Sequence, residues 1–398
     1  MDRKIRVLFL PKWYPNRYDP MPGLFIRRQA EAITPFCDVA VIYVHPDPDC
    51  PNNFEAEFSE ENEVRVLRVY YKVKGQPATM AGKALNFWKF YRANLKAIYS
   101  IRQFEPDLVH AHILTRMALI GMKVSRSRHI PLVISEHWSR YYPENNTYRG
   151  FFRQLLTSFI VKKAGAVIAV SEKLREAMQQ CNLKNEEFKV VPNVVDTEIF
   201  RVGPSFGAHP VKTMVHISCF EDKSKNISGF LRSIKELAGQ RSDFRCLMVG
   251  EGPDWEEMKD YAGFLGIRDS VVFFTGLKAD NELAGILAAA DFSVVSSRYE
   301  TFGTVLIESL ACGIPVVTTN VGIAPEVINA GNGILVPPGD ETAMTEALGQ
   351  MIGRCGSFDR EAIRAGVAVK YTRENVGREI VDLYRKVLTV GEKLKIKN

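Results

Sequence analysis

The stretch DFSVVSSRYETFGTVLIESLACGIPVVTT, residues 291–319, contains the pattern that decides the fold. Its two ends are apolar, β-branched runs of strand length. Between them the pattern predicts a loop and then a helix over Thr304 to Cys312, which Gly313 ends. A strand that is apolar on both faces is typical of a parallel sheet covered by helices on both sides. The stretch therefore predicts an α/β domain.

The same alternation of strands and helices extends along the chain in two series. In the first half the predicted strands are RVLFL, DVAVIYV, EVRVLRVY, DLVHAH, PLVISEH, AVIAV and KVVP. In the second half they are KTMVHIS, FRCLMVG, SVVFFTG, DFSVVSS, IPVVTT and GILVPP. Pro and Gly cluster in residues 191–210, so we place a domain boundary there. We predict two Rossmann-like, doubly wound α/β domains that face each other across a cleft, with ligands at the carboxyl ends of the strands.

Composition limits the class of protein. Of the 398 residues, 46% are hydrophobic and 25% are charged, as in ordinary globular proteins. No apolar run reaches the ~18 residues of a membrane-spanning helix, and the run in MDRKIRVLFLPKWYP is too short for a signal peptide. The seven cysteines are odd in number and form no CxxC pair, so we expect reduced thiols. These features predict a soluble, cytoplasmic protein.

Positive charge is concentrated in one part of the chain. Residues 71–175 contain 18 Lys and Arg against 5 Asp and Glu, and an acidic patch, Glu55 to Glu63, precedes them. Within this part, KALNFWKFYRANLKAIYSIRQF (83–104) mixes basic and aromatic residues at helical spacing. Such a helix can bind an anionic lipid surface or a phosphorylated partner, or it can be a solvated basic face above an aromatic core stripe. No nucleic-acid recognition motif accompanies the charge, so nucleic acid is not an expected partner.

Two acidic residues, Glu300 and Glu308, flank the start of the helix that follows Gly303. A helix that begins at a glycine beyond a strand end directs free N–H groups toward a ligand, and these groups suit phosphate oxygens. Glu308 lies on a small, apolar stripe of this helix, where a carboxylate needs hydrogen-bond donors. No Lys or Arg occurs in residues 300–353, so the local sequence offers these carboxylates no cationic partner. The hydroxyls of a ribose could instead donate hydrogen bonds to Glu308, and the hydroxyls of a second sugar could donate to Glu300. Alternatively, both acids pair with bases that are distant in the sequence.

These two glutamates stand in YETFGTVLIESLACGIPVV, which strongly resembles the retaining glycosyltransferases of family four, enzymes with the two-domain GT-B fold. In the first half, PMPGLFIRRQAEAI resembles the family's glycine loop and first helix, and LVHAHILTRMALIG and ISEHWSRYY resemble its histidine-bearing strand ends. In the second half, LMVGEGPDWEEM, VVFFTG and GIAPEVI resemble its nucleotide-side loops. The final YTRENVGREIVDLYRKVL resembles a helix that in this family returns to the first domain. The resemblance implies an acceptor-side domain over 1–199, a nucleotide-sugar domain over 200–372 and a returning helix in 373–398.

The resemblance also implies roles for individual residues. Glu308 would hold the nucleotide ribose, and Glu300 would hold a hydroxyl of the transferred sugar as a catalytic residue. Gly23 would let the first domain approach the diphosphate. Other expected substrate contacts come from the backbone at the start of the helix and from the glycines of the nucleotide-side loops: Phe302, Gly303, Thr304, Val305, Gly250, Gly252 and Gly276.

The expected phosphate-binding cations show one departure from the family. The family usually has an Arg and, five residues later, a Lys after the first strand of the second domain. Here the segment is HISCFEDKSKNISGF, in which Lys225 matches the Lys and Phe220 stands at the Arg position. We expect Lys225 to be catalytic. Lys223 could replace the missing charge, or that charge could come from the first domain.

Three histidines end predicted strands of the first domain. By similarity His137, in SEHW, would contact the donor sugar near the reacting centre through its ring and its backbone. His110 and His112 are separated by one residue, and we expect their side chains to point to opposite faces of the strand. Only one of them would then face the ligand, and we favour His112.

The sequence predicts an enzyme that needs neither a metal ion nor an organic cofactor. It contains no DxD triplet of the kind that holds a cation on a diphosphate, and neither His112 nor His137 has a carboxylate at ligand spacing. A nicotinamide-dependent oxidoreductase is disfavoured because no G-x-G-x-x-G follows a strand. We predict retaining transfer of a sugar from a UDP- or GDP-sugar to a glycan or lipid-linked acceptor in surface polysaccharide biosynthesis, peripheral to the inner face of the membrane. A UDP-sugar 2-epimerase and a non-catalytic sugar-nucleotide-binding relative are the alternatives.

Overall fold

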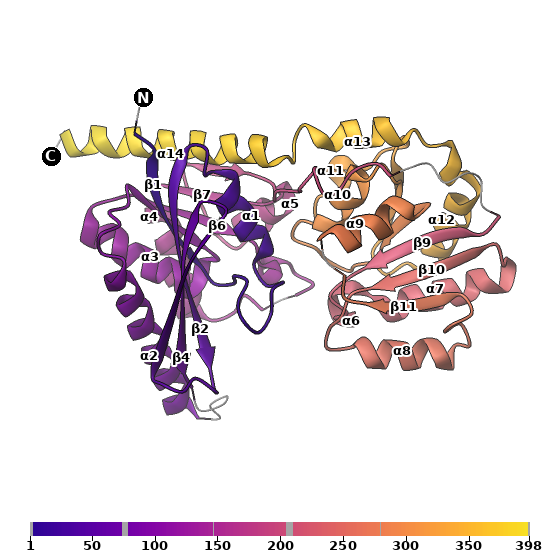
Figure 1. The fold of residues 1–398 in the computed structure, drawn as a ribbon, viewed down its shortest axis with the longest axis horizontal. Coiled ribbons are helices and arrows are strands. Elements are labelled where there is room, and N and C mark those ends of the chain that lie inside the picture. Colours follow the sequence, from indigo (N-terminus) through magenta and orange to yellow (C-terminus); the bar gives the residue numbers. More distant parts are fainter. Residues whose placement is uncertain (1–2, 74–78, 146, 204–209, 279, 397–398) are drawn as a thin grey trace. The chain divides into compact units, whose positions relative to one another are not determined.

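The computed structural model describes residues 3–73, 79–145, 147–203, 210–278 and 280–396, without the side chains of Thr115 and residues 391–396. The chain forms two compact units (Figure 1). Unit 1 comprises Met1–Tyr141, Thr147–Val194 and Arg373–Asn398, and unit 2 comprises Tyr142–Asn146 and Val195–Thr372. The Pro- and Gly-rich stretch that we expected to separate the domains extends past Val194, and its residues 204–209 lie outside the described part of the chain.

Unit 1 is built on an eight-stranded sheet with the strand order β3-β4-β2-β1-β5-β6-β7-β8. Its strands are β1 (Ile5–Pro11), β2 (Cys37–Asp47), β3 (Phe54–Glu61), β4 (Val64–Lys72), β5 (Leu108–His112), β6 (Leu132–Glu136), β7 (Ala166–Ala169) and β8 (Phe188–Val190). All neighbouring strands are parallel except β3 and β4, which are antiparallel. The seven strands predicted in this half of the sequence are therefore confirmed.

Strand β3 was not predicted, because its sequence FEAEFSEE was interpreted only as an acidic patch. Glu55, Glu57 and Glu61 alternate along the strand and so lie on one face of it. On that face they bind arginines: Glu55 and Glu57 pair with Arg17, and Glu61 pairs with Arg68. The period of two in the glutamates was thus a strand signal expressed in charged residues.

Helices cover both faces of the unit 1 sheet. Helices α2 (Met80–Ser100), α3 (Leu114–Arg128) and α4 (Phe151–Lys163) lie together on one side (Figure 1). On the other face α1 (Leu24–Ala32) and the returning helix α14 (Arg373–Ile396) share one apolar core with β1 and β2. A Cβ atom at Gly377 would lie 2.2 Å from the carbonyl oxygen of Ala32, so glycine permits the close contact of α14 with α1. Helices η1 (Ser139–Tyr141) and α5 (Glu172–Gln180) complete the unit.

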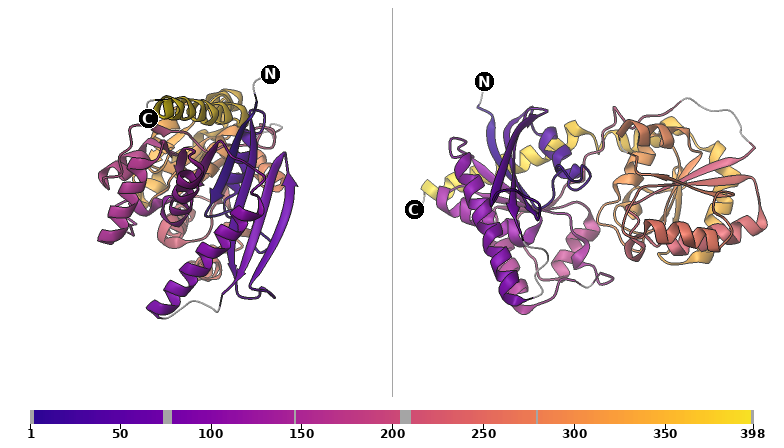
Figure 2. Two further views of the ribbon diagram at one scale, coloured as in Figure 1. Left: turned by 90° about the vertical axis from the view of Figure 1, so that its left-hand side faces the viewer. Right: turned by 60° about the horizontal axis from the view of Figure 1, so that its bottom comes forward.

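Unit 2 is built on a six-stranded, fully parallel sheet with helices around it (Figure 2). Its strands are β9 (Lys212–Ile217), β10 (Phe244–Val249), β11 (Val272–Gly276), β12 (Phe292–Val295), β13 (Val316–Thr319) and β14 (Gly333–Val336). Its helices are α6 (Asp222–Lys225), α7 (Ile227–Gln240), α8 (Trp255–Phe264), α9 (Asp280–Ala289), α10 (Thr304–Ala311), α11 (Ala324–Val327), α12 (Glu341–Arg354), η2 (Cys355–Ser357) and α13 (Arg360–Ala368). All six predicted strands and the predicted helix after Gly303 are confirmed.

The strand order of unit 2 places its ligand-binding edge. The order β11-β10-β9-β12-β13-β14 reverses direction between the adjacent strands β9 and β12. In open α/β sheets, ligands bind beyond the carboxyl ends of the strands at such a reversal. The loops that follow β9 and β12 contain Lys225 and Glu300, respectively, so the topology brings these two predicted site residues to one edge.

Three further properties of the described residues bear on the predicted class of protein. None of the seven cysteines forms a disulfide bond. No helix in the described ranges is both long and apolar enough to span a lipid bilayer. In the same ranges, no group of three or more His, Cys, Asp or Glu side chains is arranged to hold a metal ion.

Candidate active site

Helix α10 begins directly at the ligand-binding edge of unit 2. Gly303 has a left-handed backbone, with φ of +93°, and Thr304 starts the helix. The loop before the helix is held by the segment that follows β13, because the N–H of Ile323 donates to the carbonyl of Phe302 at 2.9 Å, and Phe302 is buried. The first N–H groups of a helix have no intrahelical acceptor, and they favour an anion. This turn, at Thr304 and Val305, is partly exposed and therefore accessible to a ligand.

Glu300 is bound by a lysine from the neighbouring loop. The carboxylate of Glu300 forms an ion pair with the Lys225 ammonium, and the Ser297 hydroxyl donates to the same carboxylate oxygen at 2.8 Å. The side chains of Lys225 and Glu300 are only 18% and 17% exposed. Of the two alternatives for Glu300, sugar hydroxyls or a base distant in the sequence, the structure shows the pairing with a distant base. The structure places a cation and a carboxylate together at the edge where α10 begins.

Two hydrogen bonds hold the Lys225 segment against the Glu300 segment. The Ser296 hydroxyl donates to the carbonyl of Lys225 at 2.8 Å, and the N–H of Arg298 donates to the carbonyl of Ser224 at 2.8 Å. Burial by itself lowers the pKa of the Lys225 ammonium, but the Glu300 carboxylate raises it, and the net shift is upward. Lys225 is therefore a positively charged group with a fixed position.

Glu308 lies one helical turn further along α10. Its residue is 5% exposed, on the helix face that packs into the unit, as the apolar stripe predicted. Burial, and then the Glu308 carboxylate, raise the pKa of the Cys312 thiol to about 12. Glu308 and Cys312 are therefore neighbours within the buried half of α10.

The glycines of the nucleotide-side loops permit backbone contact between loops. A Cβ atom at Gly250 would lie 1.9 Å from the carbonyl oxygen of Ser218, and one at Gly252 would lie 1.8 Å from that of Cys219. The N–H of Gly250 donates to the carbonyl of Gly276 at 2.9 Å. These glycines hold the loops after β9, β10 and β11 together at the ligand-binding edge.

Phe220, at the position where the family has an arginine, is a core residue. It is fully buried, and its ring centroid lies 4.5 Å from that of Trp255. Its backbone holds the following loop, because the N–H of Asp254 donates to the Phe220 carbonyl at 3.0 Å. Lys223 is exposed on α6 and, among the described residues, makes no hydrogen bond or ion pair. Lys223 and Lys225 are therefore the two cations that this loop offers to an anion.

Gly23 allows a tight contact within unit 1. Its φ is +73°, and a Cβ atom there would lie 2.1 Å from the carbonyl oxygen of Trp13. Gly23 is the N-cap of α1, so the same residue brings the loop after β1 against the start of that helix. Only glycine fits both requirements.

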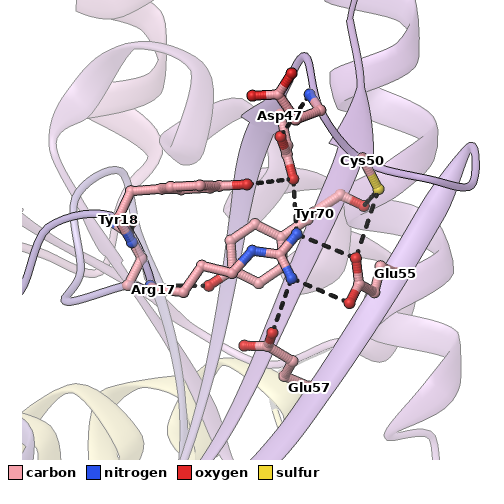
Figure 3. A network of polar contacts seen from close by, with 9 residues as sticks. Arg17, Tyr18, Asp47, Cys50, Glu55, Glu57 and Tyr70 are labelled. Atoms are coloured by element: carbon pink, nitrogen blue, oxygen red, sulfur yellow. Dashed lines mark hydrogen bonds and ion pairs between the residues drawn. The ribbon is translucent and has the colours of Figure 1, made fainter.

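The loop that leads to Gly23 is anchored by Arg17 (Figure 3). The guanidinium of Arg17 donates to Asp47 at 2.7 Å, to Glu55 at 3.0 Å and to Glu57 at 3.1 Å, and it lies 3.9 Å from the centre of the Tyr70 ring. Arg17 holds the pKa of the Glu55 carboxyl below its usual range. This network joins the loop after β1 to β2 and β3.

The predicted orientation of His110 and His112 is wrong. Their ring centroids are 4.1 Å apart, so both side chains lie on one face of β5. The reason is the period of a strand: adjacent residues alternate between faces, and residues two apart share a face. His110 has two partners, since its Nδ1 is 2.6 Å from the Tyr384 hydroxyl and its Nε2 is 2.7 Å from the Ser135 hydroxyl.

His112 and His137 form a separate pair. The Nδ1 of His112 and the Nε2 of His137 are 3.5 Å apart. The other ring nitrogens, Nε2 of His112 and Nδ1 of His137, are buried without a hydrogen-bond partner among the described residues. Burial lowers the pKa of His137 to about 3, so both rings are neutral at pH 7. Neutral rings can hydrogen-bond sugar hydroxyls, and they are not acids at that pH.

Glu136 is a residue that sequence reasoning missed. It is fully buried at the end of β6, where one oxygen accepts from the N–H groups of His137 and Trp138 at 2.8 and 2.9 Å. The other oxygen accepts from the N–H of Leu114 at 3.0 Å and from the Tyr141 hydroxyl at 2.7 Å. The N–H of His137 is therefore already used, which leaves its ring and carbonyl for a ligand. A Glu inside an otherwise apolar strand was the available sequence signal.

Two family models match the chain and together span most of it. The model described as Glycosyltransferase Family 4 matches residues 26–199, and the model described as Glycosyl transferases group 1 matches residues 209–354. The chain belongs to glycosyltransferase family 4. The resemblance inferred from the two glutamates and the ordered loops is thereby confirmed, and the matched residues include both units.

Individual relatives agree with this assignment. The chain is 29% identical over 252 residues to N-acetyl-alpha-D-glucosaminyl L-malate synthase of Bacillus anthracis, which covers 61% of this chain and 65% of that protein. The chain thus spans just under two thirds of that curated relative.

Two solved structures share the fold of this family 4 member. Sucrose-phosphate synthase of Thermosynechococcus elongatus has a TM-score of 0.77 at 20% identity, covering 97% of this chain and 100% of that one. HepE of Anabaena, solved with UDP and glucose, has a TM-score of 0.73 at 19% identity, covering 96% and 99%. The predicted GT-B fold class is confirmed.

Proposed function

We propose that this protein is a retaining glycosyltransferase that transfers a sugar from a UDP- or GDP-sugar to a glycan or lipid-linked acceptor of surface polysaccharide biosynthesis. The observation that carries the proposal is the Lys225–Glu300 pair beside the start of α10. It combines a cation, free N–H groups and a carboxylate at the carboxyl edge of one sheet. Family membership and the UDP and glucose bound to HepE support the nucleotide-sugar donor.

The proposed donor site uses each of these groups for one part of the substrate. Cleavage of the sugar–phosphate bond leaves negative charge on the nucleotide diphosphate, and positioned cations and N–H groups stabilise that charge. Lys225, Lys223 and the first turn of α10 provide them. Glu300 orients a hydroxyl of the transferred sugar, and Glu308 accepts hydrogen bonds from the ribose.

In unit 1 we propose that His137 contacts the transferred sugar. Its neutral ring, with a buried Nδ1 that has no partner among the described residues, suits a hydrogen bond to a hydroxyl. His112 fixes the other ring nitrogen. We also propose that the reaction needs no metal ion, because the chain's own cations neutralise the diphosphate. Turnover should then be unchanged by EDTA.

Incubation with candidate sugar nucleotides tests the proposed function. Nucleotide diphosphates are first screened by thermal shift, since a ligand that binds the folded state stabilises it by RT ln(1+[L]/Kd). The matching UDP- or GDP-sugars are then incubated with the protein, with and without glycan acceptors. We expect free nucleotide diphosphate and a product with the donor's anomeric configuration. Conversion to a different sugar nucleotide would instead identify a 2-epimerase, and binding without turnover a non-catalytic relative.

We further propose that unit 1 binds an anionic membrane surface, where a lipid-linked acceptor would be found. On α4, Phe151, Phe152 and Leu155 are 73%, 83% and 60% exposed, an apolar ridge that no described residue covers. Trp88 of α2, on the same side of the sheet, is 52% exposed, so the aromatic residues of α2 are not only a core stripe. Basic residues of the two helices α2 and α4 suit anionic lipid headgroups: Lys83, Lys89, Arg92, Arg153, Lys162 and Lys163.

Vesicle sedimentation tests the membrane proposal with a matched pair of variants. Phe152 on α4 and Phe264 on α8 are both 83% exposed. We expect the protein to bind vesicles containing phosphatidylglycerol at low salt and to dissociate at high salt. Phe152→Ser should weaken this binding severalfold, whereas Phe264→Ser should not. Equal binding by the two variants, or binding that salt does not change, would contradict the proposal.

A further inference from the structure

Three helices on one face of the unit 1 sheet bring together basic residues that no carboxylate neutralises. Helices α2, α3 and α4 contain four, four and three Lys or Arg residues, respectively, and none of the three contains an Asp or a Glu. In the described ranges none of these basic side chains forms an ion pair, and those of Lys89 and Arg128 donate to main-chain carbonyls. The three helices lie together on one side of the sheet (Figure 1), so their charges attract anions to one surface.

A cavity of about 480 Å³ opens on the outer side of α3 within this surface. Its lining residues all belong to α3 and recur every three or four positions, so they share one face of the helix: Leu119, Met122, Lys123, Arg126 and Ser127. Met122 is buried, whereas Lys123 and Arg126 are exposed. The cavity therefore combines an apolar base with two cations, and its volume lies in the range of small-molecule sites.

The two cations of the cavity lean toward different neighbouring helices. The Lys123 ammonium donates to the Tyr91 hydroxyl of α2 and lies 4.9 Å from the centre of that ring. The Arg126 guanidinium lies 5.8 Å from the centre of the Phe159 ring of α4 and, among the described residues, makes no hydrogen bond. An anion in the cavity thus has one cation on the α2 side and one on the α4 side. An ammonium has three N–H donors, so Lys123 keeps two of them for a ligand.

Apolar side chains are exposed next to both contacts. Phe87, one helical turn before Tyr91 on α2, is 40% exposed, and Phe159 on α4 is 44% exposed. Leu155, one turn before Phe159, is 60% exposed. A soluble anion would leave this apolar border in water, whereas a molecule with an anionic group and a hydrocarbon part covers both features. The observations favour an anionic amphiphile over a small inorganic anion.

We propose that this cavity holds one anionic phospholipid of the membrane, with its phosphate between Lys123 and Arg126 and its acyl chains along the apolar border. The proposal rests on the membrane binding of the proposed function, and it adds the class of lipid and the place where one molecule is held. Helix α3 begins at Leu114, whose N–H donates to Glu136 beside His137. The cavity residues lie about 8–20 Å further along the helix axis. The lipid is therefore a docking ligand, separate from the glycan that accepts the sugar.

Isothermal titration calorimetry with a soluble short-chain lipid tests the site without a membrane surface. Dihexanoyl phosphatidylglycerol is titrated below the concentration at which it forms micelles. We expect saturable binding of one lipid per chain. Dihexanoyl phosphatidylcholine, which lacks the net charge, and glycerol 3-phosphate, which lacks the chains, should bind roughly tenfold more weakly or less. Binding of glycerol 3-phosphate as tight as that of the lipid would identify a phosphate site and overturn the lipid site.

A matched pair of double variants assigns the binding to the cavity. Lys123→Met with Arg126→Met should weaken binding of the short-chain lipid roughly tenfold or more. Lys184→Met with Lys235→Met removes two exposed lysines outside α2, α3 and α4 and should stay within twofold of the wild type. Leu155→Ser, at an exposed position of the apolar border, should weaken binding severalfold. All of these side chains are exposed, and thermal unfolding checks that each variant is folded.

Two results would overturn the lipid site. One is vesicle binding by the wild type without saturable binding of the monomeric lipid, which would mean that the surface is attracted to the membrane only as a whole. The other is tight binding of hexaglutamate in place of the lipid, which would assign the cavity to an acidic protein segment. Failure of the proposed function gives a different result. In that case no nucleotide diphosphate stabilises the protein, while lipid binding and its loss in the Lys123 and Arg126 double variant remain.

Discussion

Replacing Lys225 with methionine removes the ammonium that binds Glu300 and keeps most of the side-chain volume. Both side chains of this pair are less than one-fifth exposed, so water screens the lost interaction only partly. Loss of one positioned charge partner of a transition state costs about 2.7–4 kcal/mol, or 10²–10³ in kcat. We therefore expect Lys225→Met to lower turnover by about a hundredfold or more.

The assay measures release of nucleotide diphosphate from the donor that the thermal-shift screen identifies. Lys235→Met, which removes an exposed lysine of α7 in the same unit, is the control and should keep turnover within twofold. Thermal unfolding of each variant checks that the fold is intact. A turnover of Lys225→Met close to that of the wild type would remove Lys225 from the site.

A double variant tests whether Lys225 and Glu300 act as one unit. In the structure the Glu300 carboxylate has the Lys225 ammonium and the Ser297 hydroxyl as partners. If the pair acts together, Lys225→Met with Glu300→Gln should be about as slow as the slower single variant, because groups that act as a unit are not additive. Effects that multiply instead would show two independent roles.

Other predictions concern the loop before α1 and the core of unit 2. Gly23→Ala should destabilise unit 1 by more than the ~1–2 kcal/mol that a left-handed backbone costs a residue with a Cβ atom, because this Cβ would also clash with the Trp13 carbonyl. An unchanged urea midpoint would contradict this. Arg17→Met should lower stability at pH 7, and the loss should shrink as pH falls. Arg17 keeps the pKa of Glu55 low, so the ion pair stabilises the fold at pH values above the usual glutamate pKa, and this stabilisation is lost as Glu55 becomes protonated at lower pH. Urea unfolding of the wild type and the variant at pH 7 and pH 4 measures the loss at each pH. Phe220→Arg introduces the family's residue, yet it should destabilise unit 2 by about 3 kcal/mol or more, because the side chain at this position is fully buried. Calorimetry tests this, and an unchanged melting temperature would contradict it.

The sequence predicted the strands well because burial on both faces produces continuous apolar runs. Strand β3 was not predicted because its inward face consists of glutamates that form ion pairs with Arg17 and Arg68, and a search for apolar runs does not detect such a strand. The orientation of His110 and His112 could have been predicted from the sequence, since residues two apart in a strand have side chains on the same face.

The partners of the candidate site residues depend on contacts between distant segments. Lys225 and Glu300 are 75 residues apart, and only the adjacency of β9 and β12 brings them together. Phe220 aligned with a family arginine, but its burial against Trp255 could not be read from the alignment of motifs. Glu136 needs donors from α3 and η1, so its role depends on the packing of three segments.

The return of α14 to unit 1 has a consequence during protein synthesis. The core of that unit includes Val376, Ile380 and Tyr384 together with residues of β1 and β2. A ribosome therefore translates all of unit 2 before it supplies the helix that covers this face of the first sheet. At about 5–20 residues per second, the nascent first sheet waits many seconds with an apolar surface uncovered. Such a surface is a natural place for a chaperone to bind until translation passes Val387.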